Sequence, residues 1–186
     1  MSQKRIWING QIYSITTKTF GNLSVFDDLE YGEILLDNIK YYQNQFEFKL
    51  LAYCILPDHL HLLIWPSFKH SISKIMQLIK YRTASDIRKY RMDSYCKLCN
   101  KNHVCSRQPN RLSQCWNDVD EIGTIWQKSF YDRIIRSDRQ LQNTIDYIDY
   151  NAVHHNLVNN PIDWVYSSFH NRYQTGKELI KIDFYE

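Results

Sequence analysis

The hydrophobic and polar positions of the chain divide it into strand-like and helix-like segments. Four segments are rich in β-branched and aromatic residues, and their apolar and polar positions partly alternate, as is typical of strands. The four segments cover residues 5–20, 46–56, 59–65 and 124–137. Pro57 and Asp58, between the second and third segments, are residues that favour turns. These two strands are therefore expected to form a hairpin.

Three other segments repeat their apolar positions at the helical spacing of three and four residues. They cover residues 26–45, 71–90 and 138–158. Asp27 or Asp28 can cap the first of these helices, and Ser71 can cap the second. Ser137 and Gln140 have the spacing of a capping box, which predicts the start of the third helix.

The predicted order of elements is strand, helix, hairpin, helix, strand, helix. This order fits one α+β domain over residues 1–186, with helices mainly on one face of a central antiparallel sheet. Residues 92–120 lose the periodicity and collect Cys, Asn, Arg and Ser. We interpret them as an inserted knob or loop.

Positive charge is concentrated in one part of the chain, although the formal net charge is only +3. Residues 69–111 contain eleven Lys/Arg and two Asp, whereas the remainder is acidic overall. Such a block favours a polyanion partner, most often nucleic acid, although a solvated surface helix and loop give the same pattern. The candidate DNA-binding residues in the block are Lys80, Arg82, Arg88, Lys89 and Arg91.

The composition is that of a globular protein without membrane spans. Hydrophobic residues make up 44% of the chain, yet no run approaches the roughly 18 apolar residues that a membrane span needs. Residues 1–10 contain no apolar core of a signal peptide. A cytoplasmic location is therefore expected.

Two histidines, His59 and His61, interrupt the apolar run of the third predicted strand. Alternate residues of a strand point to the same side, so both imidazoles are expected on one face, with Leu60, Leu62 and Ile64 in the core on the other. Two imidazoles side by side can bind a divalent metal. From this pair alone, two separately hydrogen-bonded histidines are the more common alternative.

The helix predicted over residues 138–158 carries a candidate nucleophile. Its narrow apolar stripe consists of Leu141, Ile145, Ile148 and Ala152. Tyr147 and Asn151 lie one turn apart on the flank of this stripe, where a helix packed on a sheet borders a cleft. Tyr150 is expected on the opposite side, in solvent. Tyr147 is thus the better site candidate and Asn151 offers an oxygen to a metal, although ordinary packing and surface roles also fit both.

These residues resemble a known family. The run YCILPDHLHLLIWP, residues 53–66, and the run from Trp126 to His170 are similar to the REP-associated tyrosine transposases. Those proteins belong to the single-tyrosine HUH transposases, named for His, a hydrophobic residue and His. The resemblance covers the N-terminal part to about residue 80 and residues 125–170, and it includes Asp-Tyr-Ile-x-x-Asn at the nucleophile position.

The resemblance implies a ferredoxin-like α+β core and a set of site residues. It implies that His59 and His61 are metal ligands, that Tyr147 is the catalytic tyrosine and that Asn151 completes the metal site. The implied cofactor is Mg²⁺ or Mn²⁺. The family usually has Pro after this Asn, whereas this chain has Ala152, a change that removes no catalytic group.

The implied activity is that of a DNA transposase. It would cleave and rejoin single-stranded DNA near hairpin, REP-like sequences through a 5′-phosphotyrosine intermediate, as a monomer or a homodimer. The partner would be single-stranded or hairpin DNA. Two alternatives are a domesticated protein that binds hairpin DNA without cutting it, and a metal-dependent phosphodiesterase that uses water as its nucleophile.

A group of cysteines lies in the predicted knob. It consists of Cys96, Cys99, Cys105 and Cys115. In a cytosolic chain, this spacing fits a structural Zn²⁺ site better than disulfides, and His103 could replace one ligand. Four unrelated reduced cysteines are the alternative. Cys54 lies in a predicted strand and is expected in the core.

Overall fold

A four-stranded antiparallel sheet forms the centre of the computed structural model, which describes residues 7–98 and 124–185. Its strands are β1 Ile12–Lys18, β2 Lys49–Ile55, β3 His59–Trp65 and β4 Tyr131–Ile135. Their order in the sheet is β2-β3-β1-β4, and each neighbouring pair is antiparallel. The α+β prediction is confirmed, including the hairpin of β2 and β3. The succession of elements is that of ferredoxin-like folds.

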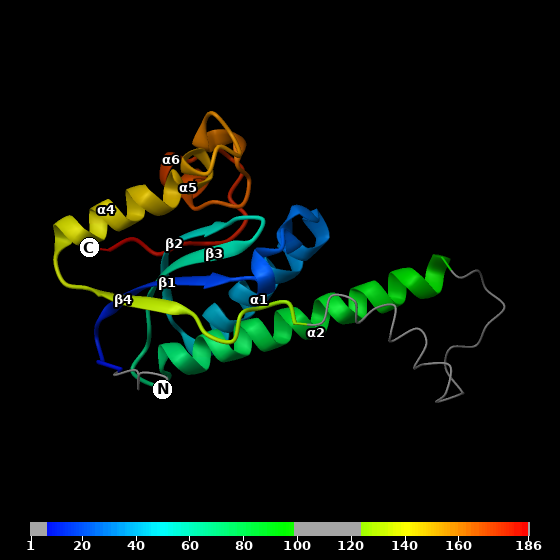
Figure 1. Cartoon of the computed structure of the whole chain (residues 1–186). Helices are drawn as coiled ribbons and strands as arrows, with labels where there is room; N and C mark the ends of the chain where they lie inside the picture. The colour runs from blue at the N-terminus through cyan, green and yellow to red at the C-terminus, as the bar shows by residue number, and fades with distance from the viewer. Residues whose placement is uncertain (1–6, 99–123, 186) are drawn as a thin grey trace.

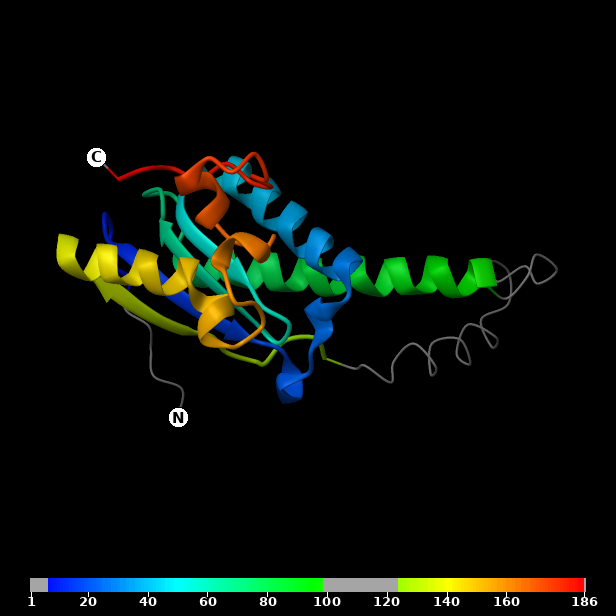
Figure 2. The ribbon, with the colours of Figure 1, turned by 90° about the horizontal axis from the view of Figure 1, so that it is seen from above.

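Helices pack on both faces of this sheet, whereas the sequence predicts them mainly on one, because the helix after β4 crosses to the face opposite α1 and α2. The α-helices are α1 Leu29–Phe46, α2 Ile72–Leu98, α4 Asp138–Asp149, α5 Asn151–His154 and α6 Phe169–Tyr173. The two longest, α1 and α2, pack together on one face, and the C-terminal part of α2 extends beyond the sheet (Figure 1). Helix α4 crosses the other face over β2 and β3 (Figure 2). No helix in the described ranges is long and apolar enough to span a membrane.

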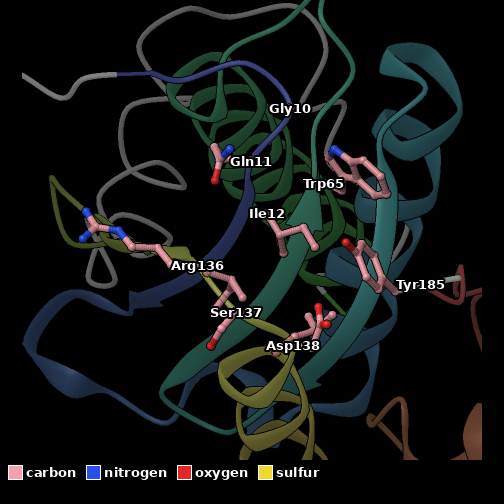
Figure 3. Close-up of a pocket in the computed structure, with 10 residues that line it drawn as sticks. Gly10, Gln11, Ile12, Trp65, Arg136, Ser137, Asp138 and Tyr185 are labelled. Atoms are coloured by element: carbon pink, nitrogen blue, oxygen red, sulfur yellow. The ribbon is translucent and has the colours of Figure 1, made fainter.

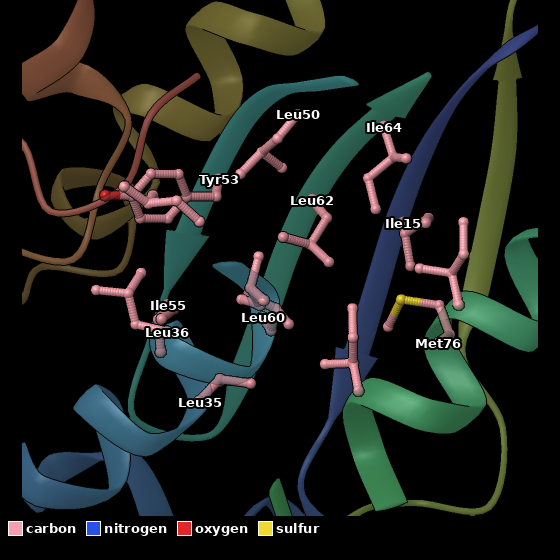
Figure 4. Close-up of a cluster of buried hydrophobic side chains, with 14 of the residues drawn as sticks. Ile15, Leu35, Leu36, Leu50, Tyr53, Ile55, Leu60, Leu62, Ile64 and Met76 are labelled. Atoms are coloured by element: carbon pink, nitrogen blue, oxygen red, sulfur yellow. The ribbon is translucent and has the colours of Figure 1, made fainter. Parts of the chain in front are cut away.

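The alternation of side chains along β3 divides the core into two layers. Leu60, Leu62 and Ile64 are fully buried in the cluster under α1 and α2, as predicted (Figure 4). Leu63 points the other way and packs with Leu141 and other residues of α4. Both faces of β3 are therefore covered, and its two histidines lie on the α4 side.

The predicted helix caps form, and the structure decides between the two candidates for the cap of α1. Asp28, and not Asp27, is the N-cap of α1 and accepts a hydrogen bond from the backbone N–H of Glu30. Ser71 accepts one from Lys74 at the start of α2. Ser137 caps α4 through the N–H of Gln140, as the sequence predicts.

The structure changes several predicted boundaries. Helix α2 continues past Tyr90 to Leu98, into the segment assigned to the knob. The third predicted helix is divided at Tyr150 into α4 and α5 and ends at His154. The last strand contains only Tyr131–Ile135 of the predicted 124–137. Local periodicity does not locate these ends because packing against other elements decides them.

The C-terminal segment closes the outer edge of β2. The N–H of Ile55 donates to the carbonyl of Tyr166, and the N–H of Ser168 donates to the carbonyl of Tyr53. The N–H of Tyr53 in turn donates to the hydroxyl of Ser168, at 3.0 Å. An edge that would otherwise present unpaired backbone groups is thereby satisfied.

A buried ion pair links this segment to α4. The Asp149 carboxylate, 3% exposed, accepts hydrogen bonds from the Arg172 guanidinium at 2.5 and 3.2 Å and from the Ser168 hydroxyl at 2.5 Å. Arg172 also donates to the carbonyl of Leu51 in β2, at 3.0 Å. One carboxylate therefore connects the end of α4, α6 and the edge strand.

We expect Arg172→Met to destabilise the fold strongly. The substitution leaves the buried Asp149 carboxylate without its counter-charge, which costs about 3–5 kcal/mol in comparable sites. Urea unfolding followed by circular dichroism measures the change. The matched control is Lys40→Met, which removes the exposed ion pair with Asp37 and should cost less than about 1 kcal/mol. Equal effects of the two substitutions would contradict this assignment.

Candidate functional site

The His-x-His pair lies where β3 begins, on the face of the sheet that α4 covers. His59 and His61 are 4% and 6% exposed, and their ring centroids are 4.9 Å apart with planes at 80°. The predicted projection of both imidazoles from one face agrees with the structure. Burial of two polar rings beside each other is costly unless their nitrogens have partners.

Each ring has a partner for its Nδ1 atom. Nδ1 of His59 lies 2.5 Å from the Asp58 carboxylate, and Nδ1 of His61 lies 3.0 Å from the Thr16 hydroxyl. Histidines that are held through Nδ1 present Nε2 for other contacts. Nε2 of His61 is buried and has no hydrogen-bond partner among the described residues.

Burial keeps both imidazoles neutral. Burial, and after it the neighbouring His59, lower the pKa of His61 to about 3. Burial also lowers the pKa of His59, although the hydrogen bond from its Nδ1–H to the Asp58 carboxylate opposes this effect. Neutral rings at pH 7 have free lone pairs, which is the form that binds a metal.

Of the two residues expected on the flank of the helix, Tyr147 contacts this pair. The ring of Tyr147 meets that of His61 edge-on, with centroids 5.5 Å apart at 88°, and its side chain is 47% exposed. Asn151 is fully buried, and neither amide atom has a hydrogen-bond partner within the described chain. Tyr150 instead packs against Phe169, with centroids 5.9 Å apart. The geometry therefore favours Tyr147 over Tyr150.

The first turn of α5 sits directly above the sheet. The Ala152 backbone hydrogen-bonds the thiol of Cys54, and Cys54 is the strand neighbour of His61 in β2. Cys54 is fully buried, as expected, and burial raises the pKa of its thiol, so it stays protonated. Asn151 is thus held over the strand that borders the histidines.

The residues present fit a divalent cation. Two neutral imidazoles and an amide oxygen form a mixed nitrogen and oxygen donor set, and His61 and Asn151 both have buried polar atoms without partners. In the described ranges no three His, Cys, Asp or Glu side chains are grouped to hold a metal. The Asn151 amide oxygen, buried and without a partner in the described chain, is therefore the candidate for a third donor.

Two further histidines, which we did not single out from the sequence, border the site. The ring of His155 lies 4.9 Å from that of His59, and the ring of His154 lies 5.8 Å from that of Tyr147. The sequence contains a signal for one of them, because His155 follows Asn151 by four residues and so shares its helix side.

A pocket of about 490 Å³ opens beside these residues. It is lined by Ser14, Thr16, His61, Tyr131, Arg133, Gln140, Asn143, Thr144 and Tyr147. Because α4 covers β2 and β3, the same face of β1 and β4 stays open and forms the floor. His61 and Tyr147 thus line an accessible groove.

A second pocket, of about 210 Å³, lies at the other end of the sheet (Figure 3). Figure 3 shows Trp65 and Tyr185 on one side and Arg136 on the other. None of the predicted site residues lines it. It adds nothing to the histidine site.

The predicted DNA-binding residues lie on α2, across the sheet from the histidines. Lys80 donates to the carbonyl of Gln127 at 2.6 Å, and the Arg82 guanidinium lies 3.9 Å from the ring centroid of Tyr41. Arg82 also pairs with Asp86, at 3.6 Å. The structure does not bring this block together with the site, and DNA binding by it stays a prediction.

The predicted zinc site falls outside the described residues. Cys99, Cys105, Cys115 and His103 all belong to the segment 99–123. Cys96 lies in the last turn of α2, but its side chain is not among those described. The zinc prediction therefore stays a prediction.

Comparisons with known proteins place this chain, with its ferredoxin-like sheet and its His-x-His pair, in one family. Residues 15–108 match the family model described as "Transposase IS200 like". The chain belongs to this family. The match includes both histidines but ends before Tyr147.

Individual relatives agree with this family. A Haemophilus influenzae protein named as a REP-associated tyrosine transposase is 36% identical over 126 residues, which is 67% of this chain and 61% of the relative. The REP-associated tyrosine transposase of Escherichia coli K12 is 24% identical over 169 residues, 90% of this chain and 81% of that protein. The chain thus spans less than two thirds of the Haemophilus relative.

A solved structure supports the fold. It is described as a REP-associated tyrosine transposase bound to a REP hairpin, and it aligns with a TM-score of 0.68 over 100% of this chain and 92% of that chain, at 23% identity. At this identity the likeness concerns the arrangement of the backbone.

We expect the neutral state of His61 to make the fold sensitive to acid. The unfolded chain binds a proton at this histidine below about pH 6.5, whereas the folded protein does so only near pH 3. The free energy of unfolding should therefore fall as the pH drops from 6.5, by up to about 1.4 kcal/mol per pH unit for this proton. Urea titrations between pH 7 and 5 measure the slope.

His61→Gln should flatten this slope, whereas His70→Gln, at a histidine that packs on Phe46 away from the site, should leave it unchanged. Identical slopes in wild type and His61→Gln would show that His61 titrates normally in the folded protein.

Proposed function

We propose that this protein cleaves and rejoins single-stranded DNA beside hairpins, as a metal-dependent HUH transposase with Tyr147 as its nucleophile. The observation that carries the proposal is the position of Tyr147. Its ring touches the metal-binding candidate His61 while its side chain is half exposed at the mouth of the groove. A nucleophile must be open to the substrate and close to the group that polarises the phosphate.

The candidate ligands for Mg²⁺ or Mn²⁺ are Nε2 of His59 and His61 and the Asn151 oxygen. When bound, such a cation polarises a phosphate and orients it for in-line displacement. The protein contributes the fixed ring orientations, through Asp58 and Thr16, and the neutral protonation state that burial enforces. Asn151 has no other partner in the described chain to compete for its oxygen.

The displacement conserves the phosphodiester energy. The Tyr147 hydroxyl loses its proton and its oxygen bonds to phosphorus, while the bond from phosphorus to the 3′-oxygen breaks and that oxygen takes up a proton. The products are a 5′-phosphotyrosine and a free 3′-hydroxyl. A later 3′-hydroxyl can reverse the reaction on the same phosphorus, so joining requires no nucleotide cofactor.

Hairpin DNA is the partner that the relatives suggest. The similar solved protein is described as bound to a REP hairpin, and the E. coli and Haemophilus relatives are both named for REP sequences. The open groove beside Tyr147 suits a single strand, because its floor is flat sheet and its walls are polar. A hairpin with a single-stranded tail is therefore the substrate class to test.

The nucleophile is tested by trapping the covalent intermediate. Wild-type protein, incubated with labelled hairpin-tailed single-stranded DNA and Mn²⁺, should give a protein–DNA adduct that survives denaturing electrophoresis. Tyr147→Phe should abolish the adduct, since it removes the attacking oxygen alone. Tyr150→Phe is the matched control: it changes a tyrosine three residues along, 38% exposed, and should leave adduct formation intact.

Two other outcomes would each indicate a different function for this protein. Cleavage that persists in Tyr147→Phe would refute the tyrosine mechanism and indicate a water nucleophile. Hairpin binding without cleavage by the wild type would indicate a domesticated DNA-binding protein.

The proposed metal site predicts cation-dependent stability. Mn²⁺ at a concentration 100 times its dissociation constant should raise the free energy of unfolding by about 2.7 kcal/mol. Mn²⁺ should bind more tightly than Mg²⁺, because two of the three donors are imidazole nitrogens and Mg²⁺ prefers oxygen. Thermal unfolding with and without each cation measures both effects.

The stabilisation should be lost in His61→Ala and Asn151→Ala and kept in His70→Ala. Undiminished stabilisation of His61→Ala by Mn²⁺ would place the cation elsewhere.

A further inference from the structure

The groove beside Tyr147 continues across two strands that the proposed chemistry does not use. In the register of the sheet, His61 lies opposite Thr16 of β1, and Thr16 lies opposite Tyr131 of β4. These three side chains therefore form one row on the same face. With strands about 4.8 Å apart, Tyr131 lies two strand spacings, or about 10 Å, from the histidine.

Tyr131 is an exposed aromatic residue that lines this groove. Its side chain is 69% exposed, although it sits on a strand of the central sheet. No aromatic or hydrogen-bond partner of its side chain occurs within residues 7–98 and 124–185. A flat ring that stands free on a sheet is the usual platform for stacking a nucleobase.

Arg133 supplies a positive charge two residues further along β4. It is exposed, lies opposite Ser14 on the groove face, and forms no ion pair within the described part of the chain. It is the single charged residue among those that line the groove, and no carboxylate accompanies it. Its guanidinium is thus available to a phosphate.

Helix α4 forms the opposite wall with an amide. Asn143 is exposed, lines the groove and precedes Tyr147 by four residues, so both lie on one side of the helix. A side-chain amide can pair with the hydrogen-bonding edge of a base. The groove therefore presents a stacking ring, a cation and an amide next to the proposed nucleophile.

We propose that Tyr131 and Arg133 form a binding subsite for the nucleotide adjacent to the scissile phosphate of a single DNA strand. The inference rests on the proposed function, since it takes the phosphate to be at His61 and Tyr147. The base of this nucleotide stacks on Tyr131, its far phosphate pairs with Arg133, and Asn143 contacts the base edge. Tyr131 lies two strand spacings, or about 10 Å, from His61 on the same face of the sheet, and both line the same groove.

The subsite is tested by binding, so that cleavage is not required. Tyr147→Phe protein prevents turnover and serves as the parent. The probes are fluorescein-labelled hairpins that share one stem and carry single-stranded tails of A, C, G or T, or a tail of abasic sites. Fluorescence anisotropy gives the dissociation constants.

Tyr131→Ala in this parent should weaken binding of at least one tail with bases by about fivefold or more, and leave the abasic tail unchanged. Tyr173→Ala is the matched control, because Tyr173 is 58% exposed on α6 and does not line the groove. Arg133→Gln should weaken binding to every tail, the abasic one included. It should also reduce the dependence of log affinity on log salt by about 0.7, as expected for one lost phosphate contact.

Arg139→Gln, at an exposed arginine of α4 outside the groove, should change neither quantity. Equal affinity of the parent and Tyr131→Ala for every tail would overturn the subsite while leaving the proposed function intact. Failure of the parent to bind any probe would overturn both. Loss of affinity for the abasic tail in Tyr131→Ala would also overturn stacking, because no base is present there to stack.

Discussion

The Asp149 carboxylate is buried between α4 and the edge strand β2, and the position of the candidate site depends on the groups that neutralise it. Arg172 and Ser168 both bind it, and both also bind the backbone of β2. Asp149 stands midway between Tyr147 and Asn151 in the chain, so this network fixes the junction of α4 and α5 that carries both residues. A buried ion pair is weak evidence for net stability, but an unpaired buried carboxylate is very unfavourable. The charge therefore specifies one arrangement of α4 more than it strengthens the fold.

The sheet separates the candidate site from the basic block of α2. Its α4 face holds neutral histidines, a half-exposed tyrosine and a polar groove, whereas the other face is covered by α1 and by α2, which carries much of the basic block. The protonation state of the site histidines is not set by the basic residues of α2, which lie on the other face of the sheet. Burial, and hydrogen bonds to Asp58 and Thr16, determine the protonation and orientation of the histidines.

The candidate site is open to solvent because α4 leaves one side of β1 and β4 uncovered. Helix α4 rests on β2 and β3, and the remaining half of that face forms the floor of the groove. The same crossing buries Asn151 and leaves Tyr147 half exposed. One helix position thus gives a buried amide and an exposed tyrosine, which is the combination that the proposed phosphoryl transfer at a metal would need.

Local sequence patterns predict the element types, the β2–β3 hairpin, the common side of His59 and His61, and the preference for Tyr147 over Tyr150. These features follow from periodicity and turn chemistry, which act between residues close in the chain. The folded arrangement is needed to see that Arg172 neutralises Asp149, that the predicted DNA-binding residues of α2 lie across the sheet from the site, and that Tyr131 aligns with His61. Those relations depend on the strand order β2-β3-β1-β4 and on packing between distant segments. No local pattern encodes them, because register and layer are set by the free energy of the whole core.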